Sequence, residues 1–151
     1  MEDLNAIALR YQTDKSSQHH NYSPAYERIT HGMRDKVKGL LEIGILLSPD
    51  PATSAKSLKM WAEYFPNAKV VGIDIDERYQ HDFGPRISCV FGDSSRKSVL
   101  DKAVSLMPEV NIIIDDASHV FRYAFATFEY LFTKLAPGGG LLHRGCAAWQ
   151  G

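Results

Sequence analysis

Short apolar segments of strand character alternate along this chain with segments whose apolar residues recur at helical spacing. Three of the apolar segments are Lys69 to Ile75, Ile87 to Phe91 and Val110 to Ile114. Alternating strands and helices form βαβ units, which build a mostly parallel sheet with right-handed crossovers. The strands are rich in Ile, Val and Leu on both faces, as expected when helices cover both sides. The pattern therefore predicts an α/β fold with a doubly wound sheet.

The remaining elements follow from the same two spacings. Helices are expected at 4–11, 23–29, 58–65, 99–107 and 124–135, and further strands at 37–45 and from 141 onward. Pro137 to Gly140 reads as a turn before this fifth strand. A six- or seven-stranded sheet would need about 60 more residues, at roughly 30 per βα unit. We therefore expect a fold that is truncated after the fifth strand.

Nothing in the sequence indicates a domain boundary, because it contains no repeat, low-complexity tract or flexible linker. We expect a single domain over 1–151, with an N-terminal helical and loop segment (1–35) followed by the sheet (36–151). The net charge of −1 argues against nucleic acid and against an anionic membrane. The sequence shows no membrane span or signal peptide, and its two cysteines form no disulfide framework. A cytoplasmic location is expected.

The most informative chemistry lies at the end of the fourth strand. The apolar run Ile112 to Ile114 continues into Asp115 and Asp116, and His119 follows three residues later. In open α/β sheets ligands bind outside the carboxyl ends of the strands, so these residues offer a metal ligand and a general base. The alternative is that Asp116 caps the next helix and that His119 lies on the surface.

Other strand ends also carry candidate ligand-binding residues. Gly44 follows Glu42 at the first strand end, where a glycine lets the backbone approach a ligand. Asp74 ends the second strand and can accept hydrogen bonds from both hydroxyls of a ribose. Asp93 ends the third strand and can contact an adenine amine. Each has a structural alternative, respectively a turn glycine, a turn former and a helix cap.

Several residues are expected to have no site role. Lys15 could meet a carboxylate, but it is read as a solvated lysine in a polar loop that extends from Thr13 to Tyr22. The same loop carries two histidines that are expected to be solvated. Trp61 is expected in the core, and Cys89 is expected to be buried and unreactive.

These motifs, taken in order, resemble the class I S-adenosylmethionine-dependent methyltransferases. The chain is more narrowly similar to the metal-dependent sugar O-methyltransferases of macrolide and polyketide antibiotic pathways, of the mycinamicin and macrocin type. The resemblance covers about residues 9 to 139 and rests on Thr13-Asp14-Lys15, His20-Asn21-Tyr22, Tyr26, Leu41 to Ile45, Ser57 to Trp61, Tyr64 to Ala68, Gly72 to Ile75, Gly92-Asp93, Ile113 to His119, Phe128-Glu129 and Leu135 to Gly139.

The resemblance implies a Rossmann-like fold and a role for each matched residue. The implied cofactor is S-adenosyl-L-methionine. The implied methyl acceptor is a hydroxyl of a small molecule, such as one on a sugar of a natural product. The implied roles are Glu42 and Gly44 at the methionine end of the cofactor, Asp74 at its ribose, Asp93 at its adenine, Asp115 in the cofactor site, Asp116 as a magnesium ligand and His119 as the general base.

The sequence departs from the family pattern at three places. Leu46 and Leu47 follow Gly44 where the family has more glycine, and Ala55-Lys56 replace glycines before the next helix. His143 and Arg144 stand where the family's acidic pair completes the magnesium site. Magnesium usually needs more than one carboxylate or phosphate, so the implied Mg²⁺ site is incomplete.

Two alternatives to an active methyltransferase remain, and the first follows from these departures. The chain could be a catalytically inactive remnant that binds the cofactor or a partner, and its exposed sheet edge could pair with a second copy to form a homo-oligomer. A nicotinamide-dependent dehydrogenase shares the strand-end acid Asp74, but that class needs a G-x-G-x-x-G motif, which this sequence lacks.

Overall fold

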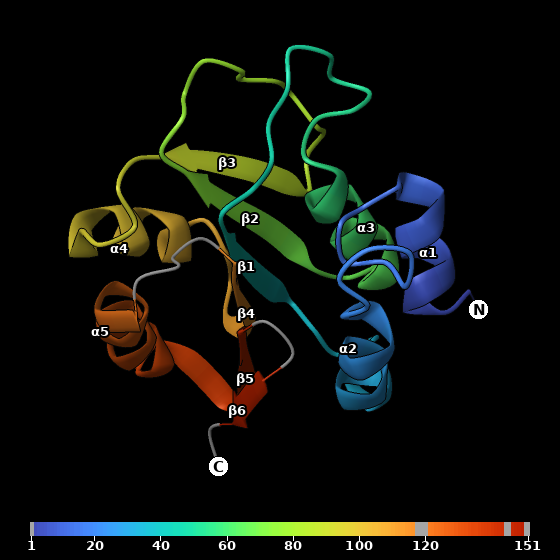
Figure 1. The fold of residues 1–151 in the computed structure, drawn as a ribbon. Helices are drawn as coiled ribbons and strands as arrows, with labels where there is room; N and C mark the ends of the chain where they lie inside the picture. Colours follow the sequence, from blue (N-terminus) through green and yellow to red (C-terminus); the bar gives the residue numbers. More distant parts are fainter. Residues whose placement is uncertain (1, 117–120, 144–145, 150–151) are drawn as a thin grey trace.

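A computed structural model describes residues 2–116, 121–143 and 146–149 of the chain (Figure 1). The helices are α1 (Leu4–Tyr11), α2 (Ser23–Thr30), the short 3₁₀ helix η1 (His31–Met33), α3 (Lys56–Tyr64), α4 (Lys97–Ser105) and α5 (Phe121–Phe132). The strands are β1 (Gly39–Ile43), β2 (Lys69–Asp74), β3 (Ile87–Phe91), β4 (Val110–Asp115), β5 (Leu135–His143) and β6 (Cys146–Trp149).

The strands form one sheet in the order β3-β2-β1-β4-β5-β6. The first five are parallel to their neighbours, and β6 runs antiparallel to β5. The chain builds outward from β1 to β3 and then returns to place β4 on the other side of β1. This reversal is the topological switch point of a doubly wound sheet, so the predicted Rossmann-like fold is confirmed.

Helices cover both faces of the sheet, and each face has its own apolar core (Figure 1). On one face α1, α2 and α3 pack over residues such as Leu40, Val70 and Ile112. On the other face α4 and α5 pack over their strand neighbours, such as Leu41 and Ile113. Adjacent strand residues thus point into different cores, which explains why the strands carry apolar residues on both faces.

The end of the sheet differs from the prediction. The parallel part of the sheet ends at the fifth strand, as expected, and the described residues add a short antiparallel strand, β6, that was not predicted. The predicted turn at Pro137 to Gly140 lies inside β5, where the pairing with β4 is irregular between Val110 and Ile112. Gly138 has a φ of 74°, which glycine adopts without strain and which lets the strand pass through this irregularity.

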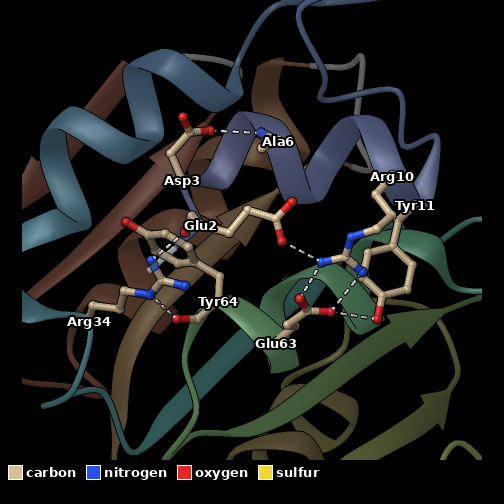
Figure 2. Close-up of polar contacts among 8 residues, drawn as sticks. All are labelled: Glu2, Asp3, Ala6, Arg10, Tyr11, Arg34, Glu63 and Tyr64. Carbon is tan, nitrogen blue, oxygen red and sulfur yellow. Dashed lines mark hydrogen bonds and ion pairs between the residues drawn. The ribbon is translucent and has the colours of Figure 1, made fainter.

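The N-terminal segment is fastened to α3 by polar contacts (Figure 2). The guanidinium of Arg10 on α1 forms ion pairs with Glu63 on α3 and with Glu2. Tyr11 donates a hydrogen bond to Glu63. Arg34 donates to the backbone carbonyl of Tyr64 at 2.7 Å, and its guanidinium lies over the Tyr64 ring. These contacts hold α1 and the segment around η1 against the face of the sheet that α3 covers.

Across the described part of the chain, every helix is too short or too polar to span a lipid bilayer.

Candidate functional site

The candidate site lies at the carboxyl ends of the strands. There the backbone hydrogen bonds between neighbouring strands continue for one residue beyond the strand ends. The backbone N–H of Gly44 donates to Ile73, that of Gly92 donates to Asp74, and that of Asp116 donates to Ile43. Gly44 has a φ of 83°, so its lack of a Cβ lets the chain turn sharply away from β1. The ends of β1, β2, β3 and β4 are therefore held together at one edge of the sheet.

A cleft of about 820 Å³ opens at this edge. Of the residues predicted for the site, Gly44, Asp74, Asp93, Asp115 and Asp116 all line it. Glu42 is not among its lining residues, because its side chain is completely buried beneath the strand ends. His119 lies outside the described residues, so its predicted place beside Asp116 stays a prediction.

Asp74 and Asp93 are each fixed by a local turn. Asp74 Oδ1 accepts a hydrogen bond from the N–H of Asp76 at 2.9 Å, and Asp93 Oδ1 accepts from the N–H of Ser95 at 2.9 Å. The bond from Ser95 keeps the pKa of Asp93 below its usual value. The alternative role of Asp93 as a helix cap is not what the structure shows, because α4 begins later and Arg96 is its N-cap.

Two large apolar side chains are unusually exposed at the cleft. Leu46 is 83% exposed and Ile75 is 75% exposed, and both line the cleft beside the ends of β1 and β2. The Leu46 side chain, which stands where the family has a glycine after Gly44, lies largely in solvent. Exposed apolar surface of this kind suits a flat, partly apolar ligand such as an aromatic base.

Lys15 is the residue that sequence reasoning placed wrongly. Its side chain is only 3% exposed, and its Nζ lies 2.8 Å from Glu42 Oε1, 3.0 Å from Asp116 Oδ2 and 3.5 Å from Asp14 Oδ1. Burial alone would lower the pKa of Lys15, but these carboxylates together raise the pKa above its ordinary value. The lysine is therefore a buried cation, not a solvated one.

The sequence carried a signal for this contact. Glu42 lies within an apolar strand, and a carboxylate that is buried there needs a cation or hydrogen bonds to compensate its lost hydration. Lys15 belongs to a polar segment, so spacing alone could not show that this segment folds back over β1. Three further cleft residues come from the same segment: Asp14, His20 and Tyr22, which the resemblance singled out as motif positions without giving them a role.

The described residues at the end of β4 do not make a magnesium site. Asp115 is almost completely buried, and Nδ1 of His143 lies 2.9 Å from its backbone oxygen and 3.9 Å from its Oδ2. Oδ2 of Asp116 faces the Lys15 ammonium. Within 2–116, 121–143 and 146–149, no group of three or more His, Cys, Asp or Glu side chains is arranged to hold a metal. Mg²⁺ is usually held by one or two carboxylates with waters completing its octahedral shell, so Asp116, paired here with Lys15, is a single ligand of an incomplete site.

Comparison with known proteins identifies relatives of this chain. It is 36% identical over 136 residues to the 8-demethyl-8-alpha-L-rhamnosyl tetracenomycin-C 2'-O-methyltransferase of Streptomyces olivaceus, covering 90% of this chain and 35% of that protein. It is 33% identical over 137 residues to the demethylmacrocin O-methyltransferase of Streptomyces fradiae, covering 91% of this chain and 34% of that protein. No family model matches the chain.

A solved structure gives the same result at the level of the fold. The MycE methyltransferase of the mycinamycin biosynthetic pathway, in complex with Mg and SAH, superposes with a TM-score of 0.82 at 31% identity. The match covers 94% of this chain and 39% of MycE. The same methyltransferase has been solved with Mg, SAH and mycinamycin VI.

The sheet order and the superposition on MycE define the fold as the Rossmann-like fold of methyltransferases. Within that class, the chain is a homologue of the sugar O-methyltransferases of macrolide and polyketide pathways. It spans about a third of the length of the curated relatives that it matches.

Proposed function

We propose that this chain binds S-adenosyl-L-methionine and takes part in methyl transfer to a hydroxyl of a small molecule, a sugar of a natural product. One observation carries the proposal. Acids from the ends of β2, β3 and β4 line a single cleft at the switch point of a sheet whose homologues are sugar O-methyltransferases. By the same homology we propose a place in antibiotic biosynthesis.

The proposed cofactor position follows from the chemistry of the lining groups. Asp74 would accept hydrogen bonds from the ribose hydroxyls, and Asp93 would accept one from the adenine amine. Gly44 and Asp115 would border the methionine end, where the positive φ of Gly44 leaves room for a ligand near the backbone. Glu42 would act on this end indirectly, through the ammonium of Lys15.

The bound cofactor would supply an electrophilic methyl group on sulfur. The protein would hold the acceptor oxygen in line with that methyl, which is the larger part of its task. A hydroxyl is a weak nucleophile at neutral pH, so a base near the end of β4 must take its proton. We assign that role to His119, and Asp116 at the cleft wall would help to orient the groups there.

Magnesium has no step in this proposal. Asp116 is the magnesium ligand that the family resemblance implies, but among the described residues it belongs to no group of three or more His, Cys, Asp or Glu side chains that could hold a metal. The acid nearest in sequence, Asp115, is buried beside His143.

Calorimetric titration with S-adenosylhomocysteine tests the cofactor site directly. We expect saturable binding to the wild-type chain and clearly weaker binding to Asp74→Asn, because the amide loses one acceptor for the ribose. Asp35→Asn is the matched control, since Asp35 is exposed and does not line the cleft. An absence of heat with wild-type protein at high concentration would remove the proposal.

Transfer of a radiolabelled methyl group to a glycosylated macrolide or polyketide tests the reaction itself. His119→Ala should lower the rate by about 10²- to 10⁴-fold, the usual contribution of general acid–base catalysis. Cofactor binding without any transfer would favour the second candidate, a catalytically inactive cofactor-binding or partner-binding module. That candidate is motivated by the incomplete set of metal-binding acids among the described residues.

The remaining assignments are proposals of the same kind. We propose that 1–151 form a single domain, with 1–35 as the N-terminal segment and 36–151 as the sheet. We also propose that the protein is cytoplasmic, binds no nucleic acid or membrane, and pairs with a second copy through the exposed edge of the sheet.

A further inference from the structure

Lys15 connects three parts of the chain that are far apart in sequence. It lies between α1 and α2, Glu42 lies on β1, and Asp116 follows β4, 101 residues away from Lys15. The Nζ atom lies within 3.0 Å of a carboxylate oxygen of both acids. The ammonium therefore bridges the two central strands of the sheet at their carboxyl ends.

The backbone of Lys15 is held as firmly as its side chain. Its carbonyl oxygen accepts hydrogen bonds from the N–H groups of Tyr22, at 3.0 Å, and Ser23, at 2.9 Å, which is where α2 begins. The segment that these bonds close, residues 13–22, is hereafter called the N-terminal strap. The end of the strap at Tyr22 is thus hydrogen-bonded to Lys15 near its beginning. The contacts of the Lys15 ammonium with the sheet therefore determine where the strap lies.

The strap forms one wall of the cleft. Asp14, His20 and Tyr22 line the large cavity beside the strand-end acids. Lys15 itself lines a second cavity of about 280 Å³, which shares Asp14, Gly44, Leu46 and Asp116 with the first. A ligand that fills the large cavity thus touches both the strap and the acid that Lys15 holds.

We propose that Lys15 is a positioning residue: its ammonium holds the N-terminal strap closed over the ends of β1 and β4 and fixes Asp116 at the wall of the cofactor cleft. Without this charge Glu42 and Asp116 repel each other, and the strap loses its ion pairs to the sheet. The consequence for the cofactor rests on the proposed function, whereas the closure of the strap is a property of the chain without any ligand.

Amide hydrogen exchange tests the strap without ligand. Lys15→Met removes the charge but keeps the length of the side chain, and Lys15→Met/Glu42→Gln also avoids a lone buried charge, so the double variant is the more stable of the two. We expect faster exchange at residues 13–23 in both variants and unchanged exchange in β2 and α4. Lys102→Met, an exposed lysine on α4, is the matched control and should exchange like the wild type. Unchanged exchange of the strap in the folded double variant would overturn the proposal.

Chemical rescue separates the charge from mere packing. Lys15→Ala leaves space where the ammonium was, and added ethylammonium should slow the exchange of the strap again. Strap exchange that is fast in this variant and does not respond to ethylammonium would assign the effect to lost packing and contradict a positioning role.

Titration with S-adenosylhomocysteine then links the strap to the cofactor. The double variant should bind about 5- to 150-fold more weakly than the wild type, the range usual for coupled sites. Equal affinity in both proteins would show that the strap does not position the cofactor wall. Wild-type protein that binds no S-adenosylhomocysteine would refute the proposed function, while hydrogen exchange would still decide whether Lys15 holds the strap.

Discussion

The Lys15 ammonium and the Glu42 carboxylate are both almost completely shielded from water. Moving such ions out of water costs several kcal/mol each, and their attraction offsets that cost only while both partners are present. A buried pair of this kind adds little net stability, but it makes the fold depend strongly on each member. At the scale of single residues, this pair is the place where one substitution has the largest electrostatic effect.

Lys15→Met should therefore lower the free energy of unfolding by about 3–5 kcal/mol, because it leaves Glu42 as an uncompensated buried charge. Lys15→Met/Glu42→Gln should recover a large part of this loss, since neither residue then carries a charge. Urea denaturation at neutral pH measures both. A single variant as stable as the double variant would contradict the coupling of the two residues.

The strand-end acids show what can be predicted at this scale. Asp74, Asp93, Asp115 and Asp116 follow apolar strands in the sequence, and parallel strands bring their carboxyl ends to one edge, so their convergence was predictable. The place of Lys15 was not, because it depends on how a polar loop folds over a strand that is distant in sequence.

At the scale of elements, the docking of α1 on α3 depends on exposed charges (Figure 2). The hydrogen bond from Arg10 holds the pKa of Glu63 below its ordinary value of 4.5. A depressed carboxyl pKa gives a stabilising contribution that is present above 4.5 and is lost as the pH falls through the folded-state pKa.

Glu63→Gln should therefore lower the urea midpoint slightly at pH 7, and the difference from wild type should disappear in acid once Glu63 is protonated in both states. The effect should also shrink in high salt, because the pair is exposed to solvent. Denaturation curves at both pH values and two salt concentrations measure this. A difference that persists unchanged in acid would show that the contact is not ionic.

The start of β1 is packed too closely for any side chain. A Cβ at Gly39 would lie 2.0 Å from the backbone oxygen of Glu109 and 3.1 Å from Met107. Gly39→Ala should destabilise the protein by at least about 1–3 kcal/mol, as overpacking of a core does. Gly32→Ala is the control, since no atom lies within 4 Å of the position of its Cβ. Thermal unfolding compares the two, and equal melting temperatures would contradict the packing at Gly39.

Strands and helices were predictable to the extent that periodicity alone determined them. β3 was predicted at its observed bounds, because four apolar residues and one serine lie between turn formers. β5 was not, since Pro137 and the three glycines after it signal a turn and only pairing with β4 extends them as a strand. β6 was not predicted either, because it forms by antiparallel pairing with β5 and no local sequence pattern indicates that pairing.

At the scale of the whole molecule, the cleft joins four strands and the N-terminal strap, so a ligand in it stabilises the entire sheet. At a concentration of 100 times its Kd, S-adenosylhomocysteine should add about 2.7 kcal/mol to the free energy of unfolding. For a chain of this size that corresponds to an increase in Tm of about 5–10 °C. Differential scanning fluorimetry with a ligand series measures it, with adenine alone as the comparison. No shift for a ligand that calorimetry shows to bind would contradict this link.

The ion pair between Lys15 and Asp116 joins residues that are 101 positions apart in the sequence. It can form only when β4 has taken its place beside β1 in the sheet. Contacts so distant in sequence form late, because the intervening chain must be ordered first. During synthesis on the ribosome, the strap has no acid of β4 to meet until most of the chain has emerged. The proposed affinity for S-adenosylhomocysteine should therefore appear only after β4 has paired with β1.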